Sequence, residues 1–149
     1  MEPTHIYHEL GDYEIFLIAT SENECLDTLI KETGVKIRGE GMIQFPDAFM
    51  PNLYGGSGGE YSMDFSKATV EVFYPYSKGV VDYKLEVYDR WGGLVFESDQ
   101  VDIGWDGYID GMLAPQDVYV FRAKGSFTNG KKFNKVGNVT LLHGQPDIR

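Results

Sequence analysis

Apolar and polar side chains alternate with a period of two along most of this chain, and no long segment carries apolar residues at the helical spacing of three and four. In 82–88 one face carries Tyr83, Leu85 and Val87, and 117–124 shows the same alternation with bulky aromatic and branched side chains. The pattern predicts further strands at 13–19, 29–37, 42–45, 69–74, 94–97 and 132–142. Short strands at regular spacing indicate an all-β sandwich.

Glycine and asparagine mark the breaks in this alternation and favour antiparallel pairing, because they adopt the positive backbone angles that tight turns need. Trp91-Gly92-Gly93 predicts a tight hairpin loop, and Asn129-Gly130 is the common two-residue hairpin signal. Between 47 and 67 the run PNLYGGSGGEY is too rich in glycine for a strand and too long for a tight turn. An exposed, mobile loop is predicted there.

The chain is strongly acidic: 13 Lys and Arg stand against 23 Asp and Glu, a net charge of −10. Nucleic acid and anionic lipid both need a basic surface, so the charge argues against them as direct partners. The longest apolar runs are far short of the roughly 20 residues that cross a bilayer, which predicts no membrane-spanning helix. Met1 to Leu10 lacks the features of a secretory signal, so the chain is either cytoplasmic or a fragment.

Motifs for phosphate binding, zinc proteolysis and serine hydrolysis are absent from the sequence. The single cysteine, Cys25, excludes an internal disulfide and is interpreted as a small buried hydrophobe. The histidines, His5, His8 and His143, are interpreted as scattered surface residues, because a zinc site needs three or four convergent ligands. We therefore expect no metal and no cofactor.

Four acidic residues lie in a loop-rich segment: Asp99, Asp102, Asp106 and Asp110. Calcium binds oxygen-rich loops, but the spacing does not match the EF-hand loop, and Asp is a natural turn residue. Solvated turns are therefore favoured over a calcium site. A pair such as Asp106 with Glu97 could act as acid and base on a glycoside, a reaction in which the separation of the two carboxylates is decisive.

Both tryptophans, Trp91 and Trp105, lie beside glycine in predicted turns. One interpretation is a stacking platform for sugars or a recognition patch for a protein, since Trp and Arg dominate binding hot spots. The other is that both rings fold back over an end of the sandwich, with each indole N–H bonded to a carbonyl. The second interpretation is favoured, and the recognition patch stays open.

Several motifs occur in an order that resembles one family. They are FPDAFMPN at 45–52, YKLEVYDRWG at 83–92, VFES at 95–98, GWDG at 104–107, VYVF at 118–121 and GNVTLL at 137–142. Over about residues 40–143 the chain resembles the gliding-motility-associated C-terminal domain of Bacteroidetes, also called the type B sorting domain of the type IX secretion system. The fold class expected is all-β, an antiparallel Ig-like β-sandwich.

The preceding segment resembles the closing strands of a polycystic-kidney-disease-type (PKD) Ig-like domain. It contains GDYEIFLIAT at 11–20, ECLDT at 24–28, and His5-Ile6-Tyr7 at the place of that family's HxY motif. A polar, Gly-rich break at 38–41 separates the two parts. We therefore expect the terminal strands of a PKD-like module at 1–38 and the sorting domain at 39–149, as the last part of a longer secreted protein.

The resemblance implies a non-catalytic address label that the type IX machinery reads in the periplasm and that leaves its protein at the cell surface, in gliding motility or adhesion. It also implies an outer-membrane partner of the PorP/SprF kind. Recognition would use turns and an exposed strand edge, with Arg90, Trp91, Trp105 and Asp106 as candidate contacts. Many members carry acidic residues after the PN, but here Asn52 is followed by a Gly-rich run, so no calcium site is carried over.

Two other functions remain open. A carbohydrate-binding or adhesion module, with a surface glycan as partner, would need Trp91 or Trp105 to be exposed and flat, and a buried indole would count against it. A glycoside-active enzyme would need two carboxylates facing each other in a cleft. A sandwich of roughly 110 residues leaves little room for such a cleft.

Overall fold

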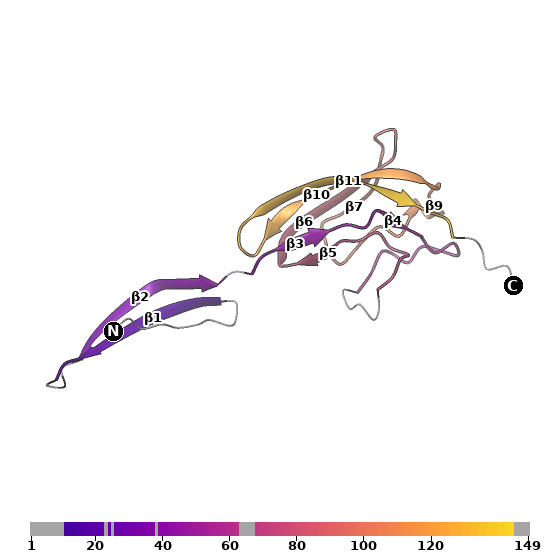
Figure 1. Cartoon of the computed structure of the whole chain (residues 1–149). Coiled ribbons are helices and arrows are strands. Elements are labelled where there is room, and N and C mark those ends of the chain that lie inside the picture. Colours follow the sequence, from indigo (N-terminus) through magenta and orange to yellow (C-terminus); the bar gives the residue numbers. More distant parts are fainter. Residues whose placement is uncertain (1–10, 23, 25, 38, 63–67, 145–149) are drawn as a thin grey trace. The chain divides into compact units, whose positions relative to one another are not determined.

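The computed structural model describes residues 11–22, 24, 26–37, 39–62 and 68–144, and within these residues it contains strands and turns but no helix (Figure 1). The prediction of an all-β chain is confirmed. The chain divides into two compact units, Met1–Gly39 and Glu40–Arg149. Each unit has its own strand pairing.

The first unit contains an antiparallel hairpin of β1 (Gly11–Thr20) and β2 (Leu26–Ile37). Its register pairs Phe16 with Ile30 on one face. Leu29 lies one position before Ile30 and therefore points to the opposite face. All three side chains are more than half exposed, at 58%, 54% and 65%. The hairpin thus presents large apolar side chains on both of its faces.

The second unit is built around a five-stranded sheet in the order β4-β11-β10-β6-β7. Neighbouring strands are antiparallel, except that β4 runs parallel to β11. The order from β11 to β7 matches the G, F, C and C′ strands of a variable-type Ig domain. The strands are β4 (Ala48–Phe49), β6 (Val80–Tyr88), β7 (Leu94–Ser98), β10 (Asp117–Phe127) and β11 (Lys132–Leu141).

A second layer lies on the other side of the core. In it, β3 (Met42–Gln44) pairs antiparallel with β5 (Tyr76–Lys78). The chain then passes directly from β3 into β4, so one short segment contributes a strand to each layer. A small separate hairpin follows, made of β8 (Tyr108–Ile109) and β9 (Met112–Leu113).

Side chains from both layers fill the core between them. The inward-facing residues of β6 and β10 are those that the period-two alternation places on one face, as predicted. Phe45, Phe73 and Phe121 form an aromatic cluster with ring centroids 4.5 to 5.5 Å apart. The buried residues of the core are Ile43, Phe49, Phe73, Tyr83, Leu85, Val87, Trp105, Ala114, Tyr119, Phe121, Ala123, Phe133, Val139 and Leu141.

Tyr119 lies near the start of β10 and donates its hydroxyl to the backbone carbonyl of Pro115, 2.8 Å away. An Ig sandwich places a tyrosine with this bond at the same corner of the fold. The residue is 3% exposed, and burial raises the pKa of its phenol. This tyrosine corner, with the strand order, confirms the Ig-like β-sandwich predicted for the second unit.

The strand predicted at 69–74 is wrong. Only Phe73 in this segment pairs, through an isolated bridge to Trp105. The hydroxyl of Thr69 accepts the N–H of Glu71 at 3.0 Å, a local bond that competes with a sheet ladder. Val72 and Phe73 are both buried, so the side chains do not alternate here.

Candidate recognition surface

The loop between β6 and β7, called the tip (89–93) from here on, projects from the second unit (Figure 1). Asp89 organises it, because its Oδ1 accepts the N–H of Trp91 at 2.9 Å and the N–H of Gly93 at 2.7 Å. The Asp89 N–H donates to the Gly93 carbonyl at 2.9 Å, and the Gly92 N–H donates to the Asp89 carbonyl at 3.1 Å. Gly92 has a φ of 82°, which favours glycine. The tip is therefore held in one conformation.

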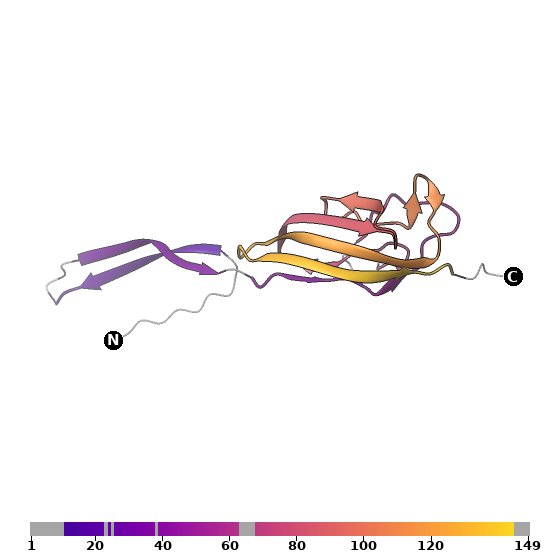
Figure 2. The ribbon, with the colours of Figure 1, turned by 90° about the horizontal axis from the view of Figure 1, so that it is seen from above.

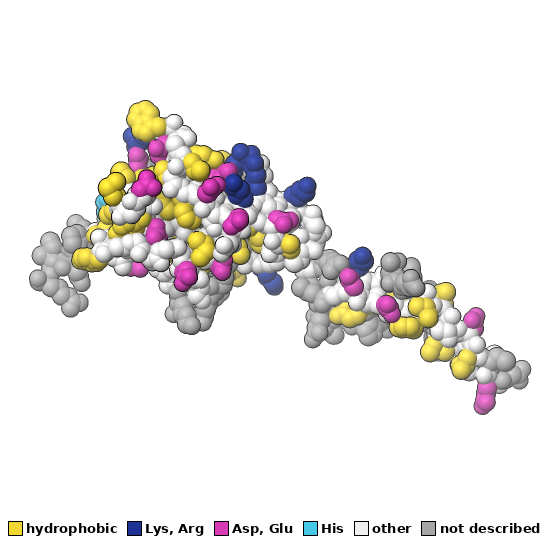
Figure 3. Space-filling view, turned by 180° about the vertical axis from the view of Figure 1, so that it is seen from behind, with side chains coloured by type: hydrophobic (Ala, Val, Ile, Leu, Met, Phe, Trp, Pro, Cys, Tyr) yellow, Lys and Arg dark blue, Asp and Glu magenta, His cyan; other side chains and the backbone are white. Residues whose placement is uncertain are grey.

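Trp91 is 87% exposed. The prediction that both tryptophan rings fold back over the core is therefore wrong for Trp91. Figure 3 shows hydrophobic side chains at the outer end of the projecting loop, with charged side chains next to them. The hydrogen bonds of the tip hold the backbone of Trp91 in a position from which its indole can be buried by another molecule.

Arg90 ties the tip to the start of β10. Its guanidinium Nη2 donates to Asp117 Oδ1, and the same carboxylate oxygen accepts the N–H of Val118 at 2.7 Å. The hydrogen bond from Arg90, followed by that from Val118, holds the pKa of Asp117 below its usual value, and the bond to Asp117 raises the pKa of Arg90. The pair is charged at neutral pH, and more than half of the Arg90 side chain is exposed.

Trp105 is fully buried. Its indole N–H donates to the carbonyl of Tyr108 at 3.0 Å. The ring packs edge-on against Tyr119, with centroids 4.8 Å apart, and contacts Phe49 with centroids 5.4 Å apart. The core-capping interpretation is confirmed for Trp105, which is not an exposed platform for a ligand in this structure.

Asp106 connects the Gly-rich run to the segment around Trp105. Its Oδ1 accepts the N–H of Tyr108 at 3.1 Å, and its Oδ2 accepts the N–H of Gly58 at 3.0 Å. Both carboxylate oxygens are thus used within the chain. Of the four candidate contacts, Arg90 and Trp91 lie together at the exposed tip, whereas Trp105 and Asp106 lie in and beside the core.

The Gly-rich run is attached to the rest of the unit at several points. Pro51 and Gly59 are buried, and the Gly59 carbonyl accepts the N–H of Gly104 at 2.8 Å. The hydroxyl of Tyr108 donates to the carbonyl of Asn52 at 2.7 Å. The expectation of an exposed loop is confirmed for 54–58 and wrong for Pro51 and Gly59, whereas 63–67 lies outside the described residues.

Two of the four candidate contacts, Arg90 and Trp105, lie near the same residue, Tyr119. The charges of Asp117 and Arg90 act on the phenol of Tyr119, whose ring contacts Trp105. Arg90 and Trp105 therefore lie at the same end of β10, one on the surface and the other in the core. Arg90 and Asp117 are 27 positions apart in the sequence, so no local sequence pattern predicts their contact.

The carboxylates considered for chemistry are engaged in separate contacts. Glu97 Oε2 lies 3.2 Å from the ammonium of Lys84, whereas Asp106 accepts backbone N–H groups. Within the residues that the structure describes, no group of three or more His, Cys, Asp or Glu side chains is placed to hold a metal ion. His143 Nε2 lies 2.9 Å from the carbonyl oxygen of Ala114.

Three residues considered in the sequence, Cys25, His5 and His8, lie outside the described residues. Across the part of the chain that is described, there is no helix with the length and apolar character needed to span a membrane.

Comparison with known families finds a match. The model of a family described as CHU_C type IX secretion signal domain matches residues 64–141. These residues include the tip, Trp105 and strands β5 to β11. The comparisons with curated proteins and with solved structures gave no match.

Proposed function

Because the chain belongs to the family of CHU_C type IX secretion signal domains, we propose that its second unit is read as a folded export signal for a larger protein. The family match over 64–141 carries this proposal. The type IX secretion machinery is then its partner, and the destination is the cell surface or the extracellular space. A signal of this kind acts by being bound, so no catalytic role is proposed for its side chains.

The finer proposal is that the exported protein serves gliding motility or adhesion in a member of the Bacteroidetes. In this proposal an outer-membrane protein of the PorP/SprF kind receives the domain. The sequence motifs at 83–92 and 104–107 support it, because they resemble the type B sorting domains. A test fuses the 149-residue chain behind a signal peptide and a fluorescent protein, in strains with and without the type IX machinery.

Surface fluorescence that depends on the type IX machinery is the expected result. Deletion of the matching PorP/SprF-like protein should abolish it as well. Retention in the periplasm of both strains, with that partner co-expressed, would contradict the proposed function.

Trp91 is the side chain we propose as the main contact with the reader of the signal. It is 87% exposed, on a backbone that Asp89 holds in place. A rigid, exposed tryptophan loses little conformational freedom on binding and buries a large apolar area, which is typical of hot spots. Arg90 would add charge beside it without losing its bond to Asp117.

Trp91→Ala should therefore reduce export without unfolding the domain. A hot-spot tryptophan contributes at least about 2 kcal/mol to binding, or roughly a thirtyfold change in affinity. The free energy of unfolding should change by less than about 0.5 kcal/mol, because the Trp91 side chain is exposed. Surface fluorescence of the fusion and urea unfolding of the purified chain measure the two effects.

Tyr54→Ala provides the matched control, since Tyr54 is an aromatic residue that is 88% exposed in another loop. It should leave export unchanged. Equal losses in the two variants, or full export of Trp91→Ala, would rule out Trp91 as the contact.

One observation favours a second candidate function, the binding of a surface glycan. Trp91 is exposed, which a sugar-stacking platform requires. The burial of Trp105 counts against the same role for that ring. Retention of an oligosaccharide by the purified chain, lost in Trp91→Ala, would favour this function if export proved independent of Trp91.

We further propose that the β1–β2 hairpin is the closing pair of strands of a PKD-like Ig-type module. An isolated two-stranded hairpin is marginally stable at best, and units below about 40 residues seldom fold without a staple. Phe16 and Ile30 on one face, and Leu29 on the other, are more than half exposed. Further strands packed against the hairpin would bury these side chains.

Hydrogen exchange on the 149-residue chain tests this proposal. Amides of β1 and β2 should exchange by local opening, orders of magnitude faster than amides of the central strand β10. Protection of β1 and β2 equal to that of β10 would show that the hairpin is a complete unit, and the proposal would be wrong.

A further inference from the structure

One side of β11 is open along most of its length in the part of the chain that the structure describes. β11 pairs with β10 from Lys132 to Leu141 on one side, whereas β4 pairs with it on the other side only at Thr140 and Leu141. No described strand pairs with that side between Lys132 and Val139. Figure 2 shows β11 at the margin of the main sheet. We call this open side the β11 edge (132–139).

Hydrogen bonds at the end of β11 show which backbone groups point to this side. Thr140 and Leu142 donate their N–H groups to carbonyls of the segment that contains β4, at 2.8 and 3.0 Å. The orientation of a strand repeats every second residue, and the register of β11 with β10 is unbroken. The N–H groups of the even-numbered residues from Lys132 to Asn138 therefore point to the β11 edge. Such groups are a template for another strand.

A groove of about 500 Å³ lies between β3 and β11, beside this edge. Met42 forms part of its lining, together with Phe127 and Phe133, whose rings are tilted by 39° with centroids 4.9 Å apart. Lys132 and Lys135 line it as well, and both are exposed. The groove thus offers apolar contact area together with positive charge.

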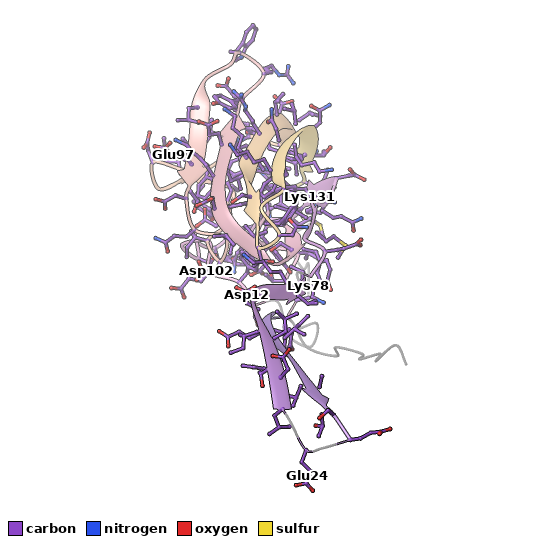
Figure 4. All side chains as sticks on the ribbon, turned by 90° about the vertical axis from the view of Figure 1, so that its left-hand side faces the viewer. Asp12, Glu24, Lys78, Glu97, Asp102 and Lys131 are labelled. Carbon is purple, nitrogen blue, oxygen red and sulfur yellow. The ribbon has the colours of Figure 1, made fainter. Side chains whose placement is uncertain are left out.

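Charge is strongly segregated in this chain. The segment 118–146 contains five of the basic residues and no Asp or Glu, which leaves 8 basic against 23 acidic residues elsewhere. Figure 4 shows the same division in space, with Lys131 on one side of the second unit and Glu97 and Asp102 on the other. Neither Lys132 nor Lys135 forms an ion pair with a described residue. Their positive charge is therefore free to attract an acidic ligand.

We infer that the β11 edge docks an extended, acidic segment of a partner protein as an added strand. The backbone of that segment would bond to the outward N–H groups of β11, as in other cases of strand addition. Asp or Glu side chains on one face of that segment would lie near Lys132, and apolar side chains on its other face would enter the groove beside β3, near Lys135. The inference rests on the proposed function, because the partner would be a component that reads the export signal.

A second copy of this chain fits the edge less well. Two β11 edges brought together would place lysines next to lysines, and like charges directly opposite each other destabilise strand pairs. The other long edge of the sheet, β7, carries Glu97, whose carboxylate already lies 3.2 Å from Lys84. An acidic strand from another protein has no such competing contact.

A peptide-binding experiment on the 149-residue chain tests the inference. The probe is a fluorescein-labelled peptide of about eight residues, a usual strand length, in which Glu alternates with Val. A second peptide has Lys in place of Glu, and a third has N-methylated backbone groups that cannot bond to a strand. Fluorescence anisotropy should show binding of the first peptide, at least about tenfold weaker binding of the second, and loss of binding by the third.

Variants of the chain test whether the peptide binds at β11. Lys132→Glu combined with Lys135→Glu should weaken binding of the acidic peptide at least about tenfold and create binding of the lysine peptide. Lys36→Glu combined with Lys84→Glu makes the same charge change on β2 and β6, neither of which pairs with β11, and should leave binding unchanged. Val136→Pro removes an N–H that points outward, which an edge strand tolerates, and should abolish binding with the circular dichroism spectrum retained.

Several outcomes would overturn the inference. The inference is wrong if the acidic peptide does not bind, if the two double charge variants have equal effects, or if the acidic and lysine peptides bind equally well. Concentration-dependent dimers in sedimentation, lost in Val136→Pro, would assign the edge to a second copy instead. If peptide binding fails while the fluorescent fusion is still exported, this inference is wrong and the proposed function stands; binding without export gives the opposite conclusion.

Discussion

Replacing Trp105 with alanine is expected to lower the free energy of unfolding of the second unit by about 3–5 kcal/mol, the usual cost of truncating a buried tryptophan. The ring is fully buried, packs against Tyr119 and Phe49, and bonds to the carbonyl of Tyr108. The substitution would leave a cavity and an unpaired carbonyl together. Because domains have only about 5–15 kcal/mol of stability, a large part of it would be lost.

Urea unfolding monitored by circular dichroism measures this loss. Trp91→Ala removes the same side chain from an exposed position and should change the free energy of unfolding by less than about 0.5 kcal/mol. Export of Trp105→Ala should fall with the folded fraction, whereas export of Trp91→Ala should fall with the fold intact. Similar stabilities of the two variants would contradict the burial of Trp105.

The second large effect is expected at Gly59, where alanine should be far more costly than at the neighbouring Gly58. Both glycines have a φ of +79°, so both substitutions carry the strain of a left-handed residue, about 1–2 kcal/mol. A Cβ at Gly59 would lie 1.9 Å from the carbonyl oxygen of Gly104, whereas a Cβ at Gly58 meets nothing within 4 Å. The difference between the variants isolates the steric clash.

We expect Gly59→Ala to exceed Gly58→Ala by at least about 2 kcal/mol, since the bond between Gly104 and Gly59 would have to break and the segment leading into Trp105 would have to move. Thermal and urea unfolding of the two variants provide the comparison. Equal losses would mean that the Gly-rich run lies away from Gly104.

The sheet strands could be predicted from the sequence wherever one face of a strand is buried. The alternation in 82–88 and 117–124 identified the inward residues of β6 and β10, because burial of one face imposes a period of two. The hairpin β8–β9 was missed because two-residue strands are too short to show alternation. Its turn has a sequence signal, because Asp110-Gly111 is a dipeptide typical of tight hairpin turns. In the structure both residues have a positive φ, 51° and 79°.

The two tryptophans show where prediction from sequence ends. Each lies beside a glycine in a turn, and the local sequence gives no reason to treat them differently. What buries Trp105 is its position over Tyr119 and Phe49, residues that come from distant parts of the chain. The ion pair of Arg90 with Asp117 is equally remote in sequence. A candidate site can be proposed from residue types, but exposure is decided by tertiary contacts.

The pairing of β4 with β11 sets a condition on when this fold can form. β4 lies near the start of the second unit and β11 at its end, and they meet through Ala48 with Thr140 and Phe49 with Leu141. During synthesis β11 follows the other described strands of the second unit. Until β11 is made, β10 has only β6 as a neighbour in the sheet. Assembly of this sheet therefore waits until β11 has been synthesised. A chain that stops before β11 lacks the strand between β4 and β10, so this sheet cannot close.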